Sequence, residues 1–194
     1  RFDENGRGDE IFAEHISRIH KIVSKLGKTM LIWDDMFEIY PAALEMIPRD
    51  MIMCSWYYNY FIDKAPGHFL NLINKDIFAQ YDKLGFKYIF CSRDLQITNT
   101  ISFTKYAHRY NALGGMVTSW AREVDFYLQA YPHYAFAGRL WNLPNPYDVD
   151  TDKLFDEVIA QITQTSDPAV IKAIKTHHHL RDMGFGIRTT YARG

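Results

Sequence analysis

Three of the four tryptophans in this chain stand at the ends of short apolar segments: Trp33, Trp56 and Trp120. Flat aromatic faces pack against the apolar C–H faces of pyranose rings, and carboxylates and guanidinium groups hydrogen-bond the ring hydroxyls. Charged candidates for these polar contacts follow three of the segment ends, as Asp34, Asp94 and Arg122. The residue types and their positions therefore predict a carbohydrate site.

The segments that must position these side chains alternate between two periodicities. Continuous apolar runs predict short buried strands over residues 29–33, 51–56, 88–91 and 116–120. Apolar residues at three- and four-residue intervals predict helices over 9–26, 41–47, 66–85, 103–113 and 127–140, and two further helices over 152–165 and 168–182. This alternation is typical of an α/β fold with a parallel sheet and right-handed crossovers. A doubly wound sheet and a (β/α)₈ barrel both satisfy it.

Ligands of parallel α/β folds bind at the carboxyl ends of the strands, because the βα loops gather at that edge. The three tryptophans occupy this same topological place in three different units. For any one of them, a plain structural role is equally compatible, since a large aromatic side chain can simply fill the mouth of a barrel. The three together, with charged neighbours, favour the sugar site.

Three segments resemble the family 20 glycoside hydrolases, the β-N-acetylhexosaminidases, and within them the hexosaminidase D-like branch. The segments are LGKTMLIWDDM at 26–36, the Trp56-Tyr57-Tyr58 strand end, and GGMVTSWAR at 114–122. The resemblance spans most of residues 1–142. It implies a (β/α)₈ TIM-type barrel, of which residues 1–145 supply about the last four βα units and residues 146–194 a C-terminal helical extension.

This resemblance also implies an activity, the removal of terminal β-linked N-acetylhexosamine by a substrate-assisted retaining mechanism. The three tryptophans would box the sugar ring. Tyr58 matches a residue that contacts the acetamide group, and Arg122 or Glu123 matches one that holds the distal hydroxyls.

The family's catalytic Asp-Glu pair follows a strand, and in this chain the pairs at 3–4, 9–10 and 156–157 follow none of the expected strands. The stretch at 6–8, Gly-Arg-Gly, resembles the loop that comes after the catalytic pair. We therefore expect the pair to lie upstream of Arg1 and the isolated chain to be inactive. The alternative is a non-catalytic carbohydrate-binding or scaffold barrel module.

The overall charge points to no charged partner. The chain has 22 basic and 23 acidic residues and a formal charge of -1, which favours neither nucleic acid nor an anionic membrane. No segment approaches the roughly 20 apolar residues of a membrane span. Cytoplasmic location is weakly favoured. Besides a carbohydrate substrate, we expect a missing N-terminal half-barrel or a second copy as partner, because half a barrel leaves open strand edges.

Cysteine and histidine suggest no metal or cofactor. Cys54 and Cys91 lie in apolar strand segments, which indicates buried thiols. The sequence leaves open whether their two strands are neighbours in the sheet. Three consecutive histidines at 177–179 point in different directions on a helix and are expected to form a solvated helix end.

Overall fold

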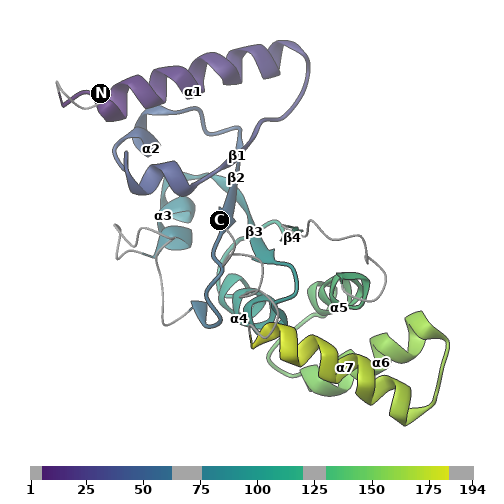
Figure 1. Ribbon diagram of the computed structural model, residues 1–194. Coiled ribbons are helices and arrows are strands. Elements are labelled where there is room, and N and C mark those ends of the chain that lie inside the picture. The colour runs from purple at the N-terminus through teal and green to yellow at the C-terminus, as the bar shows by residue number, and fades with distance from the viewer. Residues whose placement is uncertain (1–5, 63–75, 120–129, 184–194) are drawn as a thin grey trace, which may run out of the picture.

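The computed structural model describes residues 6–62, 76–119 and 130–183 (Figure 1). Helices alternate with short strands, as the sequence predicts. The strands are β1 (Leu31–Trp33), β2 (Ile52–Trp56), β3 (Lys87–Arg93) and β4 (Gly115–Thr118). The helices are α1 (Gly8–Lys25), the 3₁₀ turn η1 (Asp35–Glu38), α2 (Ala43–Met46), α3 (Ile77–Leu84), α4 (Ile97–Ala107), α5 (Tyr131–Trp141), α6 (Thr151–Thr163) and α7 (Pro168–Asp182).

The four strands form one parallel sheet in the order β1-β2-β3-β4. Each strand pairs with the strand that follows it in the chain, and the order never reverses. A doubly wound sheet reverses its strand order at a switch point, so that alternative does not describe these four strands. Right-handed crossovers between strands added in one direction bring the connecting helices to a single face of the sheet.

The main apolar core lies on this helix-covered face. Alternate strand residues, including Met53, Tyr88 and Phe90, belong to the same buried cluster as side chains of α1, α2, α3 and α4. Aromatic rings dominate it: the ring of Phe78 lies 4.6 Å from that of Tyr88. Successive strand side chains point to opposite faces, so the residues between them are left for the other face of the sheet.

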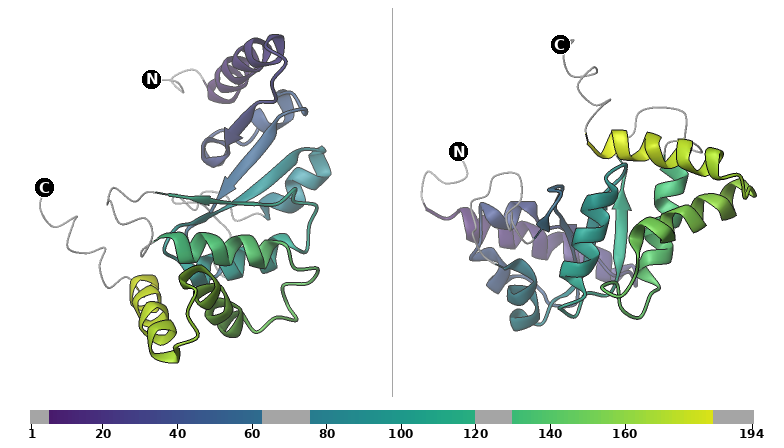
Figure 2. Two further views of the ribbon diagram at one scale, coloured as in Figure 1. Left: turned by 90° about the vertical axis from the view of Figure 1, so that its right-hand side faces the viewer. Right: turned by 90° about the horizontal axis from the view of Figure 1, so that it is seen from below.

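Helices α5, α6 and α7 gather beside β4, at the opposite end of the molecule from α1 (Figure 2). A second buried cluster joins Phe136 of α5 and Phe155 of α6 to Ile97 of α4. The described part of the C-terminal extension therefore packs on α4 and α5. Gly115 permits a close approach here, because a Cβ at this position would lie 2.6 Å from ring atoms of both Phe90 and Trp141.

Two expectations from the sequence are wrong. The helix expected over 103–113 is α4, which begins six residues earlier and ends at Ala107. Its first turn is polar after Ile97, and Asn99 and Thr100 are buried there, so the apolar pattern did not mark it. The expected solvated histidine end is also wrong for His178, which is 1% exposed and meets the Phe155 ring edge-on at 5.4 Å.

The expectation of buried thiols is confirmed. Cys54 and Cys91 are free, buried thiols, and they lie on the neighbouring strands β2 and β3. Among the described residues, no helix combines the length and apolar character that crossing a bilayer requires. The start of the helix expected over 66–85 lies outside the described residues, which resume before α3.

Candidate functional site

A pocket of about 480 Å³ lies where the strands β1, β2 and β4 end. This is the carboxyl edge at which the sequence predicts the site. Its lining joins two tryptophans and a tyrosine to a carboxylate, two hydroxyls and two apolar side chains: Trp33, Asp35, Trp56, Tyr58, Met116, Val117, Thr118 and Ser119.

Aromatic rings supply much of the wall. Trp56 and Tyr58 are two residues apart at the end of β2, and their ring centroids lie 4.8 Å apart at an interplanar angle of 42°. Trp33, at the end of β1, is 46% exposed, which is unusual for so large an apolar side chain. The pocket therefore offers flat apolar surface that a ligand can cover.

Hydrogen bonds fix the polar groups of the pocket. The Trp56 indole N–H donates to Asp35 Oδ1 at 3.2 Å. The Thr118 hydroxyl donates to the carbonyl oxygen of Ser92 at 2.9 Å, so it accepts from the Tyr58 hydroxyl at 2.8 Å. This last bond joins the end of β2 to β4 across the pocket.

Asp34, predicted to bind substrate, does not line this pocket. It is 2% exposed, and its Oδ2 accepts a hydrogen bond from the Tyr81 hydroxyl at 2.8 Å on the helix-covered side. Burial, and then the nearby Asp34 carboxylate, raises the pKa of Tyr81 well above its ordinary value. The neighbouring carboxylate of Asp35 lines the pocket instead.

Two-residue alternation would have placed Asp34 away from the pocket, because the residue after Trp33 points to the opposite face of the strand. The chain then turns into η1, whose first residue, Asp35, lines the pocket. The same rule applied to Tyr58 and Trp56 groups them correctly, as both line the pocket. No comparable signal singled out the lining residues of β4, which are small or aliphatic.

Asp94, the second predicted carboxylate, does not line the pocket but contacts a residue that does. It is 4% exposed, and its Oδ2 accepts a hydrogen bond from the hydroxyl of the lining residue Ser119 at 2.8 Å. Three further predicted contacts, Trp120, Arg122 and Glu123, lie outside the described residues.

A buried histidine holds the chain just after Asp94. The backbone N–H of Leu95 donates to His133 Nδ1 at 2.8 Å, and His133 Nε2 lies 2.8 Å from the Thr100 hydroxyl. Burial, and then His178, lowers the pKa of His133 to about 3. The ring is therefore neutral, with its proton on Nε2. Leu95 has a φ of 59°, a left-handed conformation that is uncommon for leucine and that this bond supports.

The two thiols lie on β2, which lines the pocket, and on its neighbour β3. Hydrogen bonding to Cys91 lowers the pKa of Cys54, while the same bond and burial raise the pKa of Cys91. Among the described residues, no group of three or more histidine, cysteine or acidic side chains is arranged to hold a metal ion.

A scan of protein-family models and a search of curated proteins each found no match to this chain. Its function is therefore inferred from the chemistry of the pocket.

Proposed function

We propose that this chain is the C-terminal half of a (β/α)₈-barrel glycoside hydrolase of the family 20 type. In this proposal the pocket binds the ring of a terminal β-linked N-acetylhexosamine, which the complete barrel removes by a substrate-assisted retaining mechanism. The observation that carries the proposal is the pairing of exposed aromatic faces with an oriented carboxylate at the carboxyl edge of a parallel sheet.

The pocket's size and chemistry support a sugar ligand. Its volume, about 480 Å³, falls within the range of small-molecule sites. The faces of Trp33 and Trp56 would pack on the C–H faces of the ring. The carboxylate of Asp35 and the hydroxyl of Ser119 would hydrogen-bond the ring hydroxyls, and Tyr58 would lie near the acetamide group.

The sheet supports the barrel part of the proposal. Four parallel strands that pair in chain order, with one core on one face, are what half of an eight-stranded barrel requires. The pocket-bearing face would then be the barrel's interior, and the outer edges of β1 and β4 would pair with the other half.

A non-catalytic carbohydrate-binding or scaffold barrel is the second candidate. It is favoured by one observation: the described lining of the pocket has a single carboxylate, Asp35, which accepts the Trp56 indole N–H. The hydrolase needs one carboxylate to orient the acetamide and a second carboxyl group to protonate the leaving oxygen. The described lining does not supply both.

Calorimetric titration with N-acetylglucosamine tests the sugar site, with glucose as the comparator that lacks the acetamide. We expect a dissociation constant on the order of 1 mM for N-acetylglucosamine and weaker binding of glucose. Trp56→Ala should weaken binding at least about tenfold, because it removes a stacking face. Trp141→Phe is the matched control, since Trp141 packs against Phe90 on the helix-covered side.

Absence of binding to a folded chain would contradict the hydrolase and the carbohydrate-binding module, and would leave the scaffold barrel. Hydrolysis of p-nitrophenyl N-acetylglucosaminide by a preparation that includes the rest of the barrel separates them. Turnover supports the hydrolase, and sugar binding without turnover supports the binding module.

A further inference from the structure

One buried side-chain amide connects the ends of β2 and β3. Asn99, in the first turn of α4, is 0% exposed. Its Nδ2 donates to the carbonyl oxygens of Tyr57 at 2.9 Å and Asn59 at 2.6 Å, and its Oδ1 accepts from the Arg93 backbone N–H at 3.0 Å. This amide thus satisfies three backbone groups at once.

The side-chain amide of Asn99 replaces backbone hydrogen bonds between β2 and β3 where their pairing ends. The paired register of β2 and β3 ends at Trp56 opposite Cys91, and Arg93 lies two residues farther along. Strands that separate leave backbone groups without partners, which is costly when those groups are buried. Asn99 fills the gap, so the two strand ends diverge while Tyr57 and Arg93 keep their hydrogen bonds.

The residues that this amide holds flank the pocket walls. Tyr57 and Asn59 are the chain neighbours of Tyr58, whose hydroxyl bonds to Thr118 across the pocket. The Arg93 guanidinium lies 5.7 Å from the centre of the Tyr58 ring. A change in the spacing of the two strand ends would therefore move the Tyr58 ring and the cation beside it.

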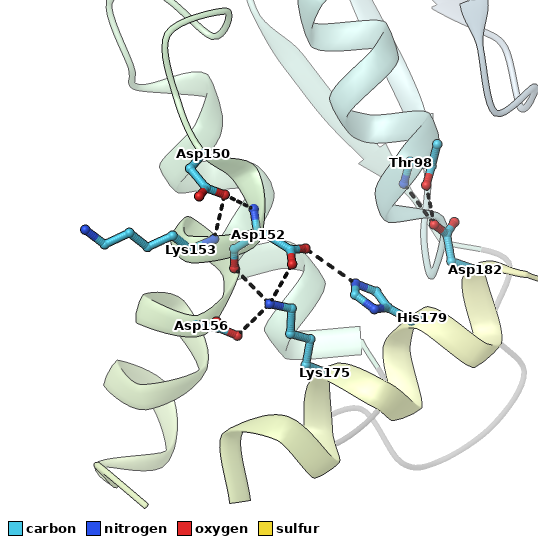
Figure 3. Close-up of polar contacts among 8 residues, drawn as sticks. All are labelled: Thr98, Asp150, Asp152, Lys153, Asp156, Lys175, His179 and Asp182. Carbon is cyan, nitrogen blue, oxygen red and sulfur yellow. Dashed lines mark hydrogen bonds and ion pairs between the residues drawn. The ribbon is translucent and has the colours of Figure 1, made fainter. Parts of the chain in front are cut away.

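The first turn of α4 is itself anchored on both sides of Asn99. The Thr100 hydroxyl donates to the Ser92 hydroxyl of β3 at 3.0 Å. The backbone N–H and the hydroxyl of Thr98 both donate to Asp182 Oδ2, at 3.1 and 2.5 Å, as the close-up of α7 shows (Figure 3). Asn99 thus projects from a fixed turn and not from a loop.

We infer that Asn99 is a positioning residue of the pocket: it sets where Tyr58 and Arg93 stand, and thereby the affinity for the ligand, without touching the ligand itself. The effect of Asn99 on ligand affinity rests on the proposed sugar site. Its effect on the positions of Tyr58 and Arg93 is independent of that proposal.

The test is Asn99→Asp, a change that keeps the size of the side chain. The acceptor for the Arg93 N–H remains, while the amide that donated to two carbonyl oxygens becomes a charged oxygen that repels them. We expect the dissociation constant for N-acetylglucosamine to rise at least about tenfold in a variant that still unfolds cooperatively. Asn142→Asp is the matched control, because that exposed amide also donates to a carbonyl oxygen, that of Gly138 at 2.7 Å.

A dissociation constant within about twofold of the wild-type value in folded Asn99→Asp would overturn the inference. A second measurement needs no ligand. In protein labelled with 5-fluorotryptophan, Asn99→Asp should shift the ¹⁹F resonance of Trp56 and leave that of Trp141 in place. If the wild type binds no sugar, the proposed function fails, and the Trp56 shift alone decides whether Asn99 positions the strand end.

Wild-type hydrogen exchange keeps the inference falsifiable even if Asn99→Asp does not fold. The Arg93 amide should exchange slowly, because its bond to Asn99 lies beyond the last pair between β2 and β3 and protects it there. Exchange at the rate of an open strand end would contradict the inference. Asn99→Ser, a milder change that keeps one hydroxyl, should speed this exchange in a folded chain.

Discussion

The two faces of the sheet use alternate residues of the same strands for different purposes. On the helix-covered face, Met53 and Tyr88 are fully buried in one continuous core. On the other face, Trp33 remains 46% exposed and lines a pocket with Trp56. The first face holds the fold together, and the second presents large aromatic side chains whose exposure contributes nothing to stability. We therefore expect substitutions on the two faces to separate stability from ligand binding.

The largest expected effect is on the helix-covered face. Phe78 is fully buried among the rings of Tyr88, Phe103 and Tyr106. Phe78→Ala should lower the free energy of unfolding by about 3–5 kcal/mol, because it leaves a cavity among these rings. Trp33→Ala removes a larger side chain from the other face and should cost less than about 1.5 kcal/mol. Urea unfolding measures the loss of unfolding free energy in both variants. Equal losses would contradict the assignment of stability to the helix-covered face.

An effect of intermediate size is expected on the pH dependence of stability. The pKa of His133 is lowered to about 3 by burial and by His178, whereas an unfolded histidine titrates near 6.5. As pH falls between these values, the unfolded chain binds a proton that the folded chain does not. The contribution of His133 to stability should therefore fall by on the order of 1 kcal/mol per pH unit.

His133→Asn, which keeps an acceptor near the Leu95 N–H, tests this contribution. The variant should be less stable at pH 7 and show a flatter decline of unfolding free energy from pH 6 to pH 4. His108→Asn, at an exposed position after α4, is the control for the loss of one histidine. A slope equal to the wild type in His133→Asn would show that this histidine does not link stability to pH.

The smallest effect on stability is expected from the ion pairs between α6 and α7. The ammonium group of Lys175 lies 3.0 Å from Asp152 and 2.9 Å from Asp156 (Figure 3). Although burial alone would lower it, hydrogen bonds to these two carboxylates raise the pKa of Lys175. Lys175→Met should cost no more than about 1 kcal/mol, as is usual for ion pairs near the surface. The exposed Lys172→Met is the control, and thermal unfolding in low and high salt is the measurement.

The order of elements and the edge that carries the pocket could be predicted from the sequence, because continuous apolar runs mark buried parallel strands. Tryptophans 33 and 56 were found this way. The first turn of α4 was missed because Thr98 and Asn99 are polar, and they have partners far away in the chain, at Asp182 and Tyr57. Burial of polar side chains by distant hydrogen bonds leaves no periodic signal. The choice of Asp34 was a local error that the alternation of side chains would have corrected, whereas the place of Asp35 depends on the turn η1.

The most direct test of the account compares the tryptophans of the two faces in one spectrum. The chain has four tryptophans, and 5-fluorotryptophan labelling gives each a ¹⁹F resonance that single substitutions assign. Addition of N-acetylglucosamine should shift the resonances of Trp33 and Trp56 in a saturable manner and leave that of Trp141 unchanged. If a saturating shift appears at Trp141 alone, or at none of the three in the folded chain, the pocket is not a sugar site.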